Sequence, residues 1–225
     1  VGEDFETYPR TECEDQQKLN ASGTDLLFQP AVSEVYAPDA KTVVSVAGLS
    51  ELHCGTSRLG HFDGVATIVC KLFNMVQPDI ALFGLKDFQQ MTVIRTMVRD
   101  LNVPVEIIGV ETVREASGLA MSSRNGYLTA EERIIAAKLY QSLCEARDAI
   151  LAGSQDYDEI ERHALLFLQE AGFHPDYFSV CRMSDLKKAG AGDVDLVLLV
   201  AARLNKTRLI DNICFSRNSL SPHLS

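Results

Sequence analysis

The sequence predicts an α/β fold in which a parallel sheet covered by helices is followed by a smaller α+β part. Strand-like and helix-like segments alternate at short spacing between residues 61 and 110, as in chains that form parallel sheets. After Val110 the order changes to two long helical patterns followed by three strand-like runs. We therefore place a domain boundary near residue 110, which gives domains 1–110 and 111–225.

Composition is that of a folded chain and argues against a nucleic-acid function. A length of 225 residues with 46% hydrophobic residues can bury one large core or two modest ones. The formal net charge of −10 argues against a nucleic-acid surface but not against a small anionic ligand, which local lysines and arginines would bind. We expect no membrane association, because the longest apolar run, residues 196–204, contains an arginine and is too short to span a bilayer. No secretory signal is visible, and the six cysteines form no C-x-x-C pair. These features indicate a reduced, cytoplasmic protein without a structural zinc site.

The first 60 residues carry only short patterns. A polar helix is expected over residues 10–22 with Gly23 as its stop. Short strands are expected at 25–28 and 42–46, and one helical turn at 31–36. A loop rich in glycine and serine follows to Gly60.

From His61 the apolar residues recur at helical spacing until Pro78 ends the helix. Residues 79–84 then read as a buried strand, followed by a helix to about Asn102 and a second strand over 105–110. The apolar face of the first of these helices consists of Val65, Ile68, Val69, Leu72, Phe73 and Val76.

The second part begins with a capping box formed by Thr129 and Glu132, which predicts the start of a long helix running to about Ala152. A second amphipathic helix is expected over 156–171. Strands are expected at 177–182, 196–204 and 207–215, the last two joined by a tight hairpin at Asn205-Lys206.

The first candidate site is the turn after the strand that begins at residue 79. In open α/β sheets, ligands bind beyond the carboxyl ends of the strands, and the start of the next helix favours an anion. There Lys86 would bind phosphate, whereas Asp87 could hold Mg²⁺ or a ribose hydroxyl. An ordinary strand–turn–helix with solvated charges explains the same residues.

The second candidate site is the segment 121–126, Met-Ser-Ser-Arg-Asn-Gly, which offers two hydroxyls and a forked guanidinium donor in a glycine-flanked loop. Ordinary loop composition is the alternative. Together the two segments form a plausible nucleotide clamp for phosphoryl or adenylyl transfer. Arg58 and His61 could add donors to the same cleft, although a histidine at a helix start is also a common capping or packing residue.

These stretches together closely resemble the pantoate–β-alanine ligase family of the nucleotidylyltransferase superfamily, over nearly the whole chain. The matching segments are residues 2–11, 58–64, 71–73, 77–79, 84–90, 118–126, 200–203 and 207–212. No single segment is specific, but the ordered set is.

The resemblance implies a Rossmann-like first domain that binds nucleotide and pantoate, and a smaller lid domain that closes over it. It implies ATP and Mg²⁺ as cofactors, adenylation of pantoate with release of pyrophosphate, and displacement of AMP by β-alanine to give pantothenate. By matching position, Gln90 would bind pantoate, Arg58 and His61 would line the cleft, and Val113 would lie against adenine. The positions that would contact ATP are Gly84, Leu85, Lys86 and Asp87, with Met121, Ser122, Ser123 and Arg124 in the phosphate loop. Lys86, Ser122 and Arg124 would be the catalytic groups; position 85 is leucine where the family usually has glutamate.

The main departure from the family pattern is at the front, where a first strand and a His-x-Gly-His segment are expected but are not found. We therefore expect this chain to be a fragment or the downstream part of a longer product, with a homodimer as the full-length form. A catalytically incomplete fragment that serves as a binding or partner subunit is the alternative function. Another nucleotidyltransferase of the superfamily, such as a class I aminoacyl-tRNA synthetase, is a third hypothesis.

Overall fold

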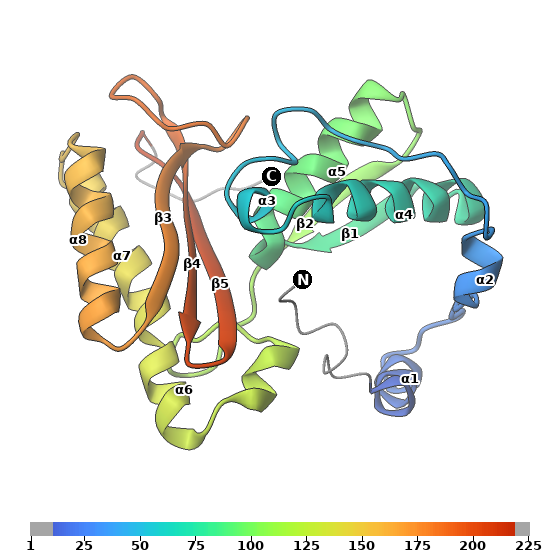
Figure 1. The fold of residues 1–225 in the computed structure, drawn as a ribbon, viewed down its shortest axis with the longest axis horizontal. Coiled ribbons are helices and arrows are strands. Elements are labelled where there is room, and N and C mark those ends of the chain that lie inside the picture. The colour runs from blue at the N-terminus through green and yellow to red at the C-terminus, as the bar shows by residue number, and fades with distance from the viewer. Residues whose placement is uncertain (1–10, 219–225) are drawn as a thin grey trace. The chain divides into compact units, whose positions relative to one another are not determined.

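The computed structural model describes residues 11–218, and its contacts divide the chain into two compact units, Val1–Thr42 and Val43–Ser225 (Figure 1). The predicted helix start at Arg10 and most of the family-like segment 2–11 lie outside the described residues.

The first unit contains helix α1 (Glu12–Ala21) and the single-turn helix α2 (Val32–Val35), which confirms both predicted helical segments. Gly23 follows α1 with a φ of 74°, as a helix stop requires. The predicted strand at 25–28 is wrong: these residues form no strand, and 77% of the surface of Leu26 is exposed. A strand needs a neighbouring strand for its backbone N–H and C=O groups, and among the described residues this segment has none.

The second unit opens with the predicted alternation. Its elements are α3 (Cys54–Ser57), α4 (His61–Val76), β1 (Ile80–Gly84), the 3₁₀ helix η1 (Leu85–Asp87), α5 (Phe88–Asp100) and β2 (Glu106–Val110). Strands β1 and β2 pair in parallel, with Ile80 opposite Glu106 and Gly84 opposite Val110, which confirms the parallel sheet.

Two expectations for this region are wrong. Residues 42–46 form no strand; the N–H of Val44 instead donates to the hydroxyl of Thr67 on α4 at 2.9 Å. Strand β1 is not buried on both faces, since Leu82 is 65% exposed whereas its neighbour Phe83 packs into the core. The alternation of side chains along a strand explains the difference, because the helices of this region cover one face of the two-stranded sheet.

The second half contains the 3₁₀ helix η2 (Ser123–Tyr127) and helices α6 (Ala130–Ala136), α7 (Lys138–Leu151) and α8 (Tyr157–Glu170). It ends in an antiparallel sheet of β3 (His174–Arg182), β4 (Asp195–Leu204) and β5 (Thr207–Ser216), in the order β3-β4-β5. The three strands, the hairpin and the helix over 156–171 are confirmed. The capping box is confirmed too: Thr129 N–H donates to Glu132 Oε2 and Glu132 N–H donates to Thr129 Oγ1.

The long helix predicted from 129 to 152 is wrong in one respect, because it is interrupted between α6 and α7. At Ala137 the ψ angle is −23°, and its carbonyl accepts from the N–H of Tyr140, three residues on, at 3.1 Å. The same carbonyl also accepts from the N–H of Gln141 at 3.3 Å, so 3₁₀-type and α-type bonds meet at this interruption.

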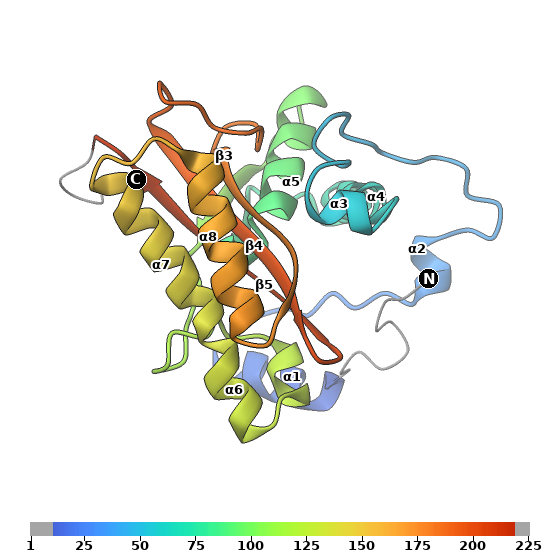
Figure 2. The same cartoon turned by 60° about the vertical axis from the view of Figure 1, so that its left-hand side comes forward.

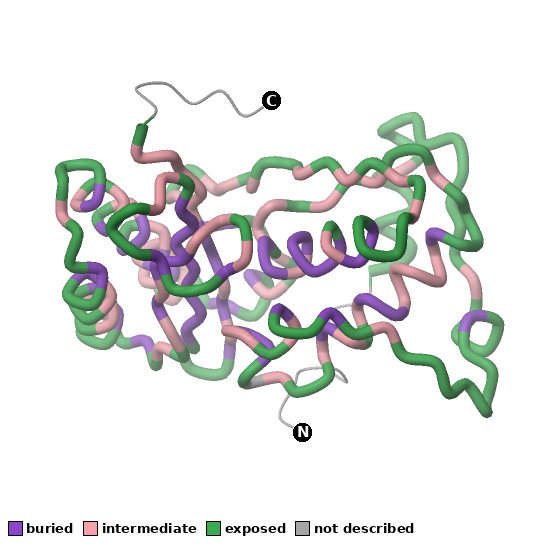
Figure 3. Tube along the Cα trace, turned by 90° about the horizontal axis from the view of Figure 1, so that it is seen from above, coloured by how far each residue is buried: buried purple, intermediate pink, exposed green. Residues whose placement is uncertain are grey.

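Strand β4 lies between two hydrophobic cores. Helices α7 and α8 cover one face of the three-stranded sheet (Figure 2), where Leu196, Leu198 and Val200 join their apolar residues. On the other face Val197 and Leu199 join the core that contains α4 and α5. Because both faces of this sheet are covered, β4 reads as a continuous apolar run rather than an alternating one. Figure 3 shows how buried and exposed residues are distributed along the chain. Residues on both sides of position 110 therefore share a core, and a domain boundary there stays a prediction.

Candidate active site

Five of the residues singled out from the sequence line one open cleft. Lys86, Asp87 and Gln90 come from η1 and α5, beyond the carboxyl end of β1. Arg58 and His61 come from the residues around the start of α4. The opposite wall comes from the antiparallel sheet, which contributes Tyr177, Leu199, Val200, Arg208, Ile210, Asp211 and Asn212.

The turn that carries Lys86 leads directly into α5. Residues 85–87 form η1, and α5 begins at Phe88, so successive backbone N–H groups point from the start of the helix. Lys86 is half-buried and Asp87 is exposed. Although Asp87 occupies the N-cap position of α5, its carboxylate makes no capping hydrogen bond. The turn therefore combines a lysine, a helix start and a carboxylate at one end of the cleft.

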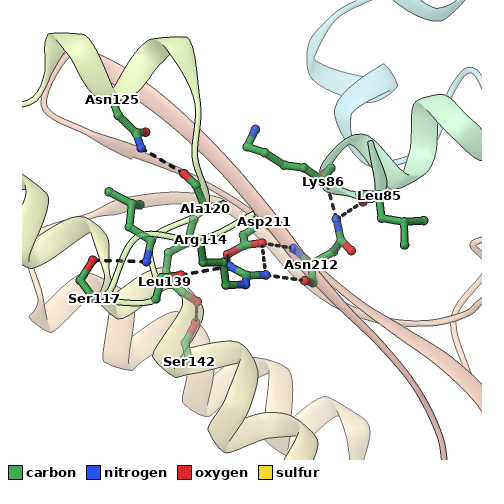
Figure 4. A network of polar contacts seen from close by, with 12 residues as sticks. Leu85, Lys86, Arg114, Ser117, Ala120, Asn125, Leu139, Ser142, Asp211 and Asn212 are labelled. Carbon is green, nitrogen blue, oxygen red and sulfur yellow. Dashed lines mark hydrogen bonds and ion pairs between the residues drawn. The ribbon is translucent and has the colours of Figure 1, made fainter. Parts of the chain in front are cut away.

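A single side chain of β5 holds this turn. The amide Nδ2 of Asn212 donates to the carbonyl of Leu85 at 2.9 Å and to that of Lys86 at 2.8 Å (Figure 4). Asn212 is buried, with 6% of its surface exposed. Two carbonyl acceptors at these distances determine which end of the side chain is the NH₂ group.

The residue before it, Asp211, anchors a second segment. Arg114 donates to Asp211 through Nη1 at 2.6 Å and Nη2 at 2.9 Å, and also donates to the carbonyl of Gly118 (Figure 4). The guanidinium lies 3.7 Å from the ring centroid of Tyr140, a cation–π contact. Burial alone would lower the pKa of Arg114. The hydrogen bonds and negative charge of Asp211 have a larger combined effect, so the pKa of Arg114 is raised.

Arg114 belongs to a tight hairpin-like turn that leads into the second candidate segment. Arg114 and Ala120 form an isolated antiparallel β-bridge, and the N–H of Met121 donates to the carbonyl of Val113 at 2.9 Å. Gly118 closes the turn with a φ of 89°, and an added Cβ there would lie 2.8 Å from the Tyr140 ring. The turn therefore places Val113 beside Met121, both with exposed side chains.

Segment 121–126 is more ordered than the loop that its composition suggested. Ser122 caps η2 by accepting a hydrogen bond from the N–H of Arg124 at 3.2 Å. Ser123 and Arg124 belong to η2 itself. Neither Val113 nor any residue of 121–124 lines the cleft, so the structure brings together the first group of predicted residues but not the second. Hydrogen bonds of Arg114, Asp211 and Asn212 connect the turn before segment 121–126 to the Lys86 turn.

At the other end of the cleft, Arg58 and His61 are partners of each other. Arg58 Nη1 lies 2.8 Å from His61 Nε2, which requires that nitrogen to be the acceptor because a guanidinium only donates. His61 begins α4 after Gly60, whose φ is 74°. His61 therefore both lines the cleft and accepts a hydrogen bond from Arg58, and its role stays a prediction.

The wall formed by the antiparallel sheet contains a further cation. Arg208 donates through Nε to Asp176 at 2.7 Å and through Nη2 to the sulfur of Cys54 at 3.5 Å. The Cys54 sulfur also lies 3.0 Å from the hydroxyl of Tyr177, a phenol whose pKa is raised mainly by burial. Arg58, Lys86 and Arg208 therefore give the cleft three basic side chains despite the acidic chain.

Comparison with known proteins identifies the family. The family model described as pantoate-beta-alanine ligase matches residues 1–214. The chain belongs to the pantoate–β-alanine ligase family. It is 55% identical to the pantothenate synthetase of Shewanella loihica over 217 residues, covering 96% of this chain and 77% of that protein. The corresponding protein of Marinobacter nauticus is 54% identical over 219 residues, 96% of this chain and 78% of the relative.

Solved structures of the family agree with the fold. Pantothenate synthetase from Thermus thermophilus superposes with a TM-score of 0.89 at 43% identity, covering 94% of this chain and 77% of that one. The ligase from Francisella tularensis, complexed with beta-gamma ATP and beta-alanine, has a TM-score of 0.73 at 29% identity, with 96% and 74% covered. The predicted resemblance and fold class are confirmed.

Sequence reasoning missed the residues of this ligase that β5 contributes. Asp211 and Asn212 were matched to the family pattern, but neither they nor Arg114 and Arg208 were assigned a role. A signal was available: an adjacent Asp-Asn pair inside an apolar strand must find buried partners, because an unpaired buried polar group is costly.

Proposed function

We propose that this member of the pantoate–β-alanine ligase family condenses pantoate with β-alanine at the expense of ATP, through a pantoyl adenylate. In the first step an oxygen of the pantoate carboxylate attacks the α-phosphorus of ATP, and pyrophosphate leaves. In the second step the amine of β-alanine attacks the acyl carbon, loses a proton, and AMP leaves. The observation that supports this best is the cleft in which Lys86, the start of α5 and Gln90 lie together.

In this proposal Lys86 and the backbone N–H groups of residues 85–88 bind the phosphates. The charge that develops on the departing pyrophosphate then meets donors that are already in place, and preorganised donors of this kind dominate catalysis of such transfers. Gly84 and Leu85 bring the backbone to the nucleotide, and Gln90, in the first turn of α5, binds pantoate. Arg58 and His61 close the other end of the cleft.

The residues present fit ATP with Mg²⁺. Within residues 11–218, no three His, Cys, Asp or Glu side chains gather where they could hold a metal ion alone. Mg²⁺ is usually bound by one or two carboxylates together with substrate phosphates, and the exposed Asp87 offers one carboxylate next to Lys86. When bound, Mg²⁺ would supply neutralisation of the phosphate charge.

Segment 121–124 and Val113 complete the nucleotide site in this proposal. Ser122, Ser123 and Arg124 would bind phosphate oxygens, while Val113 and Met121 offer adjacent apolar side chains to adenine. These residues do not line the cleft, and in this proposal segment 121–124 moves toward Lys86 when ATP binds.

The test is pantoate-dependent exchange between ATP and labelled pyrophosphate by the purified 225-residue chain, with circular dichroism to verify folding. Exchange that needs pantoate supports the ligase and separates it from other nucleotidyltransferases. A folded chain that binds ATP without exchange favours the alternative of a catalytically incomplete binding subunit. A folded chain that binds neither substrate contradicts both.

The oligomeric state and the location stay predictions. We infer a homodimer, which light scattering after size-exclusion chromatography would test, and a cytoplasmic location. Among the described helices, none has the length and apolar character needed to cross a bilayer.

A further inference from the structure

The conformation of the Lys86 turn depends on one side chain from a distant part of the sequence. Asn212 lies 126 residues beyond Lys86, yet its side-chain amide donates a hydrogen bond to the carbonyl of Leu85 and another to that of Lys86. These are consecutive carbonyls at the point where β1 has ended and α5 has not begun. Holding both restrains the peptide plane on each side of the Lys86 Cα.

That restraint controls where the lysine ammonium can go. The Cα–Cβ bond sets the direction in which a side chain leaves the backbone. A rotation of either neighbouring peptide plane therefore swings the whole lysine side chain. In Figure 4 the Lys86 side chain extends from the turn on the side away from Asn212. Lysine is a flexible point donor, so its effectiveness depends on a fixed starting direction.

Asn212 and its neighbour Asp211 are themselves held by hydrogen bonds. The backbone N–H of Asn212 donates to Asp211 Oδ1 at 2.8 Å, and the Asp211 carboxylate is held on both oxygens by Arg114. The Asp211 side chain is only 2% exposed. Bidentate arginine–carboxylate pairs are geometrically specific, so this one fixes the strand position from which Asn212 reaches the turn.

We propose that Asn212 is a positioning residue that sets the Lys86 turn for phosphate binding. The inference rests on the proposed function, because it assumes that Lys86 meets the phosphates of ATP. Asn212 acts through Lys86 rather than on the nucleotide, and this makes the proposal separable from a general structural role.

The test is a double-mutant cycle of Lys86→Ala and Asn212→Ala in the 225-residue chain, with ATP and adenosine titrated into each variant by calorimetry. Lys86→Ala is expected to weaken ATP binding on the order of tenfold, the scale of one charge-assisted hydrogen bond, and to leave adenosine binding unchanged. Asn212→Ala should likewise weaken ATP binding relative to adenosine binding, by most of the factor seen for Lys86→Ala. In the Lys86→Ala background, Asn212→Ala should then have no further effect.

The matched control is Asn74→Ala, which removes an asparagine whose Nδ2 donates to the carbonyl of Cys70 on α4, outside the cleft. It should leave both affinities unchanged. If Asn212→Ala does not fold, Asn212→Ser keeps one donor and is expected to retain an intermediate preference for ATP.

Two results would overturn the positioning role while leaving the function intact: equal weakening of ATP and adenosine by Asn212→Ala, or additive losses in the double mutant. A wild-type chain that binds ATP no better than adenosine would instead overturn the proposed function, and the positioning role with it.

Discussion

At the scale of single residues, charge and burial decide what each side chain can do. Arg58, Lys86 and Arg208 face one cleft in a chain of net charge −10, so the local charge differs in sign from the global one. Burial likewise makes the cysteines differ from one another in exposure and in thiol pKa. Cys13 is exposed, whereas Cys181 is 1% exposed, and burial, with smaller contributions from Glu161 and Asp185, raises the pKa of its thiol to about 12.

Lys86→Ala should lower pantoate-dependent ATP–pyrophosphate exchange strongly, by roughly a hundredfold, and leave folding nearly intact, because its half-buried side chain is not part of either core. Exchange rates and unfolding curves of the two chains measure both effects. Lys187→Ala, at an exposed lysine outside the cleft, is the control and should behave like the parent chain. Parent-like exchange by Lys86→Ala would refute the assignment of this lysine.

Because the Cys181 thiol is buried, we expect the folded chain to lose stability at alkaline pH. Its pKa is raised in the folded chain, so above the ordinary thiol pKa of 9.0 the unfolded chain releases a proton that the folded chain keeps. The free energy of unfolding should therefore fall as pH rises from about 9 toward 12, by on the order of 1 kcal/mol at pH 10 from this group.

Urea unfolding at pH 8 and pH 10 measures this effect, with Cys181→Val as the comparison that should show a smaller decrease. In the native chain at pH 8, iodoacetamide should modify Cys13 first and leave Cys181 protected. Rapid native-state alkylation of Cys181 would contradict the burial argument.

At the scale of elements, local signals predicted the helix ends better than the strand partners. The capping box of α6 forms as its sequence indicates, and Asn205 turns the β4–β5 hairpin with a φ of 49°. The hairpin and the cap also meet, because Asn205 Nδ2 donates to Glu132 Oε1 at 2.5 Å. The start of α6 is thereby tied to the end of the antiparallel sheet.

Thr129→Ala should destabilise the chain by about 1 kcal/mol, since it leaves an N–H of the first turn of α6 without its acceptor. Thr129→Ser keeps the hydroxyl and should unfold close to the parent chain. Thermal unfolding of the three proteins gives the comparison, and an Ala variant as stable as the Ser variant would show that the cap contributes nothing.

At the scale of the whole second unit, β4 joins the two cores. Leu198 packs with α7 and α8, whereas its neighbour Leu199 packs with the helices that flank the parallel sheet. The two-stranded parallel sheet has its own covered and exposed faces, and residues of β3, β4 and β5 all belong to the core on its covered face.

Leu198→Ala and Leu199→Ala should each cost roughly 2–5 kcal/mol, and each should shift a single cooperative unfolding transition of residues 43–225. Hydrogen exchange resolved along the chain measures this, because β2 and α8 should lose protection together in both variants. Loss of protection confined to one side of residue 110 would instead support the domain boundary predicted there.

The sequence by itself determined the type and order of most elements and the turn at Lys86. Helical periodicity in 61–76, the capping box at 129 and the strand–turn–helix at 80–100 depend on neighbours within a few residues, so they can be read locally. The strand–turn–helix pattern pointed to Lys86 and Asp87, whereas the family resemblance assigned Gln90 its role. Together with Arg58 and His61, these residues line one cleft.

Only the tertiary structure decided which extended segments become strands and which polar groups act together. Residues 25–28 and 42–46 have strand-like composition, but a strand exists only where another backbone supplies its hydrogen bonds. Asn212 and the Lys86 turn, like Asp211 and Arg114, meet across 97 or more residues. No periodicity along the chain encodes such contacts, because they are selected by the packing of β5 between two cores rather than by local propensity.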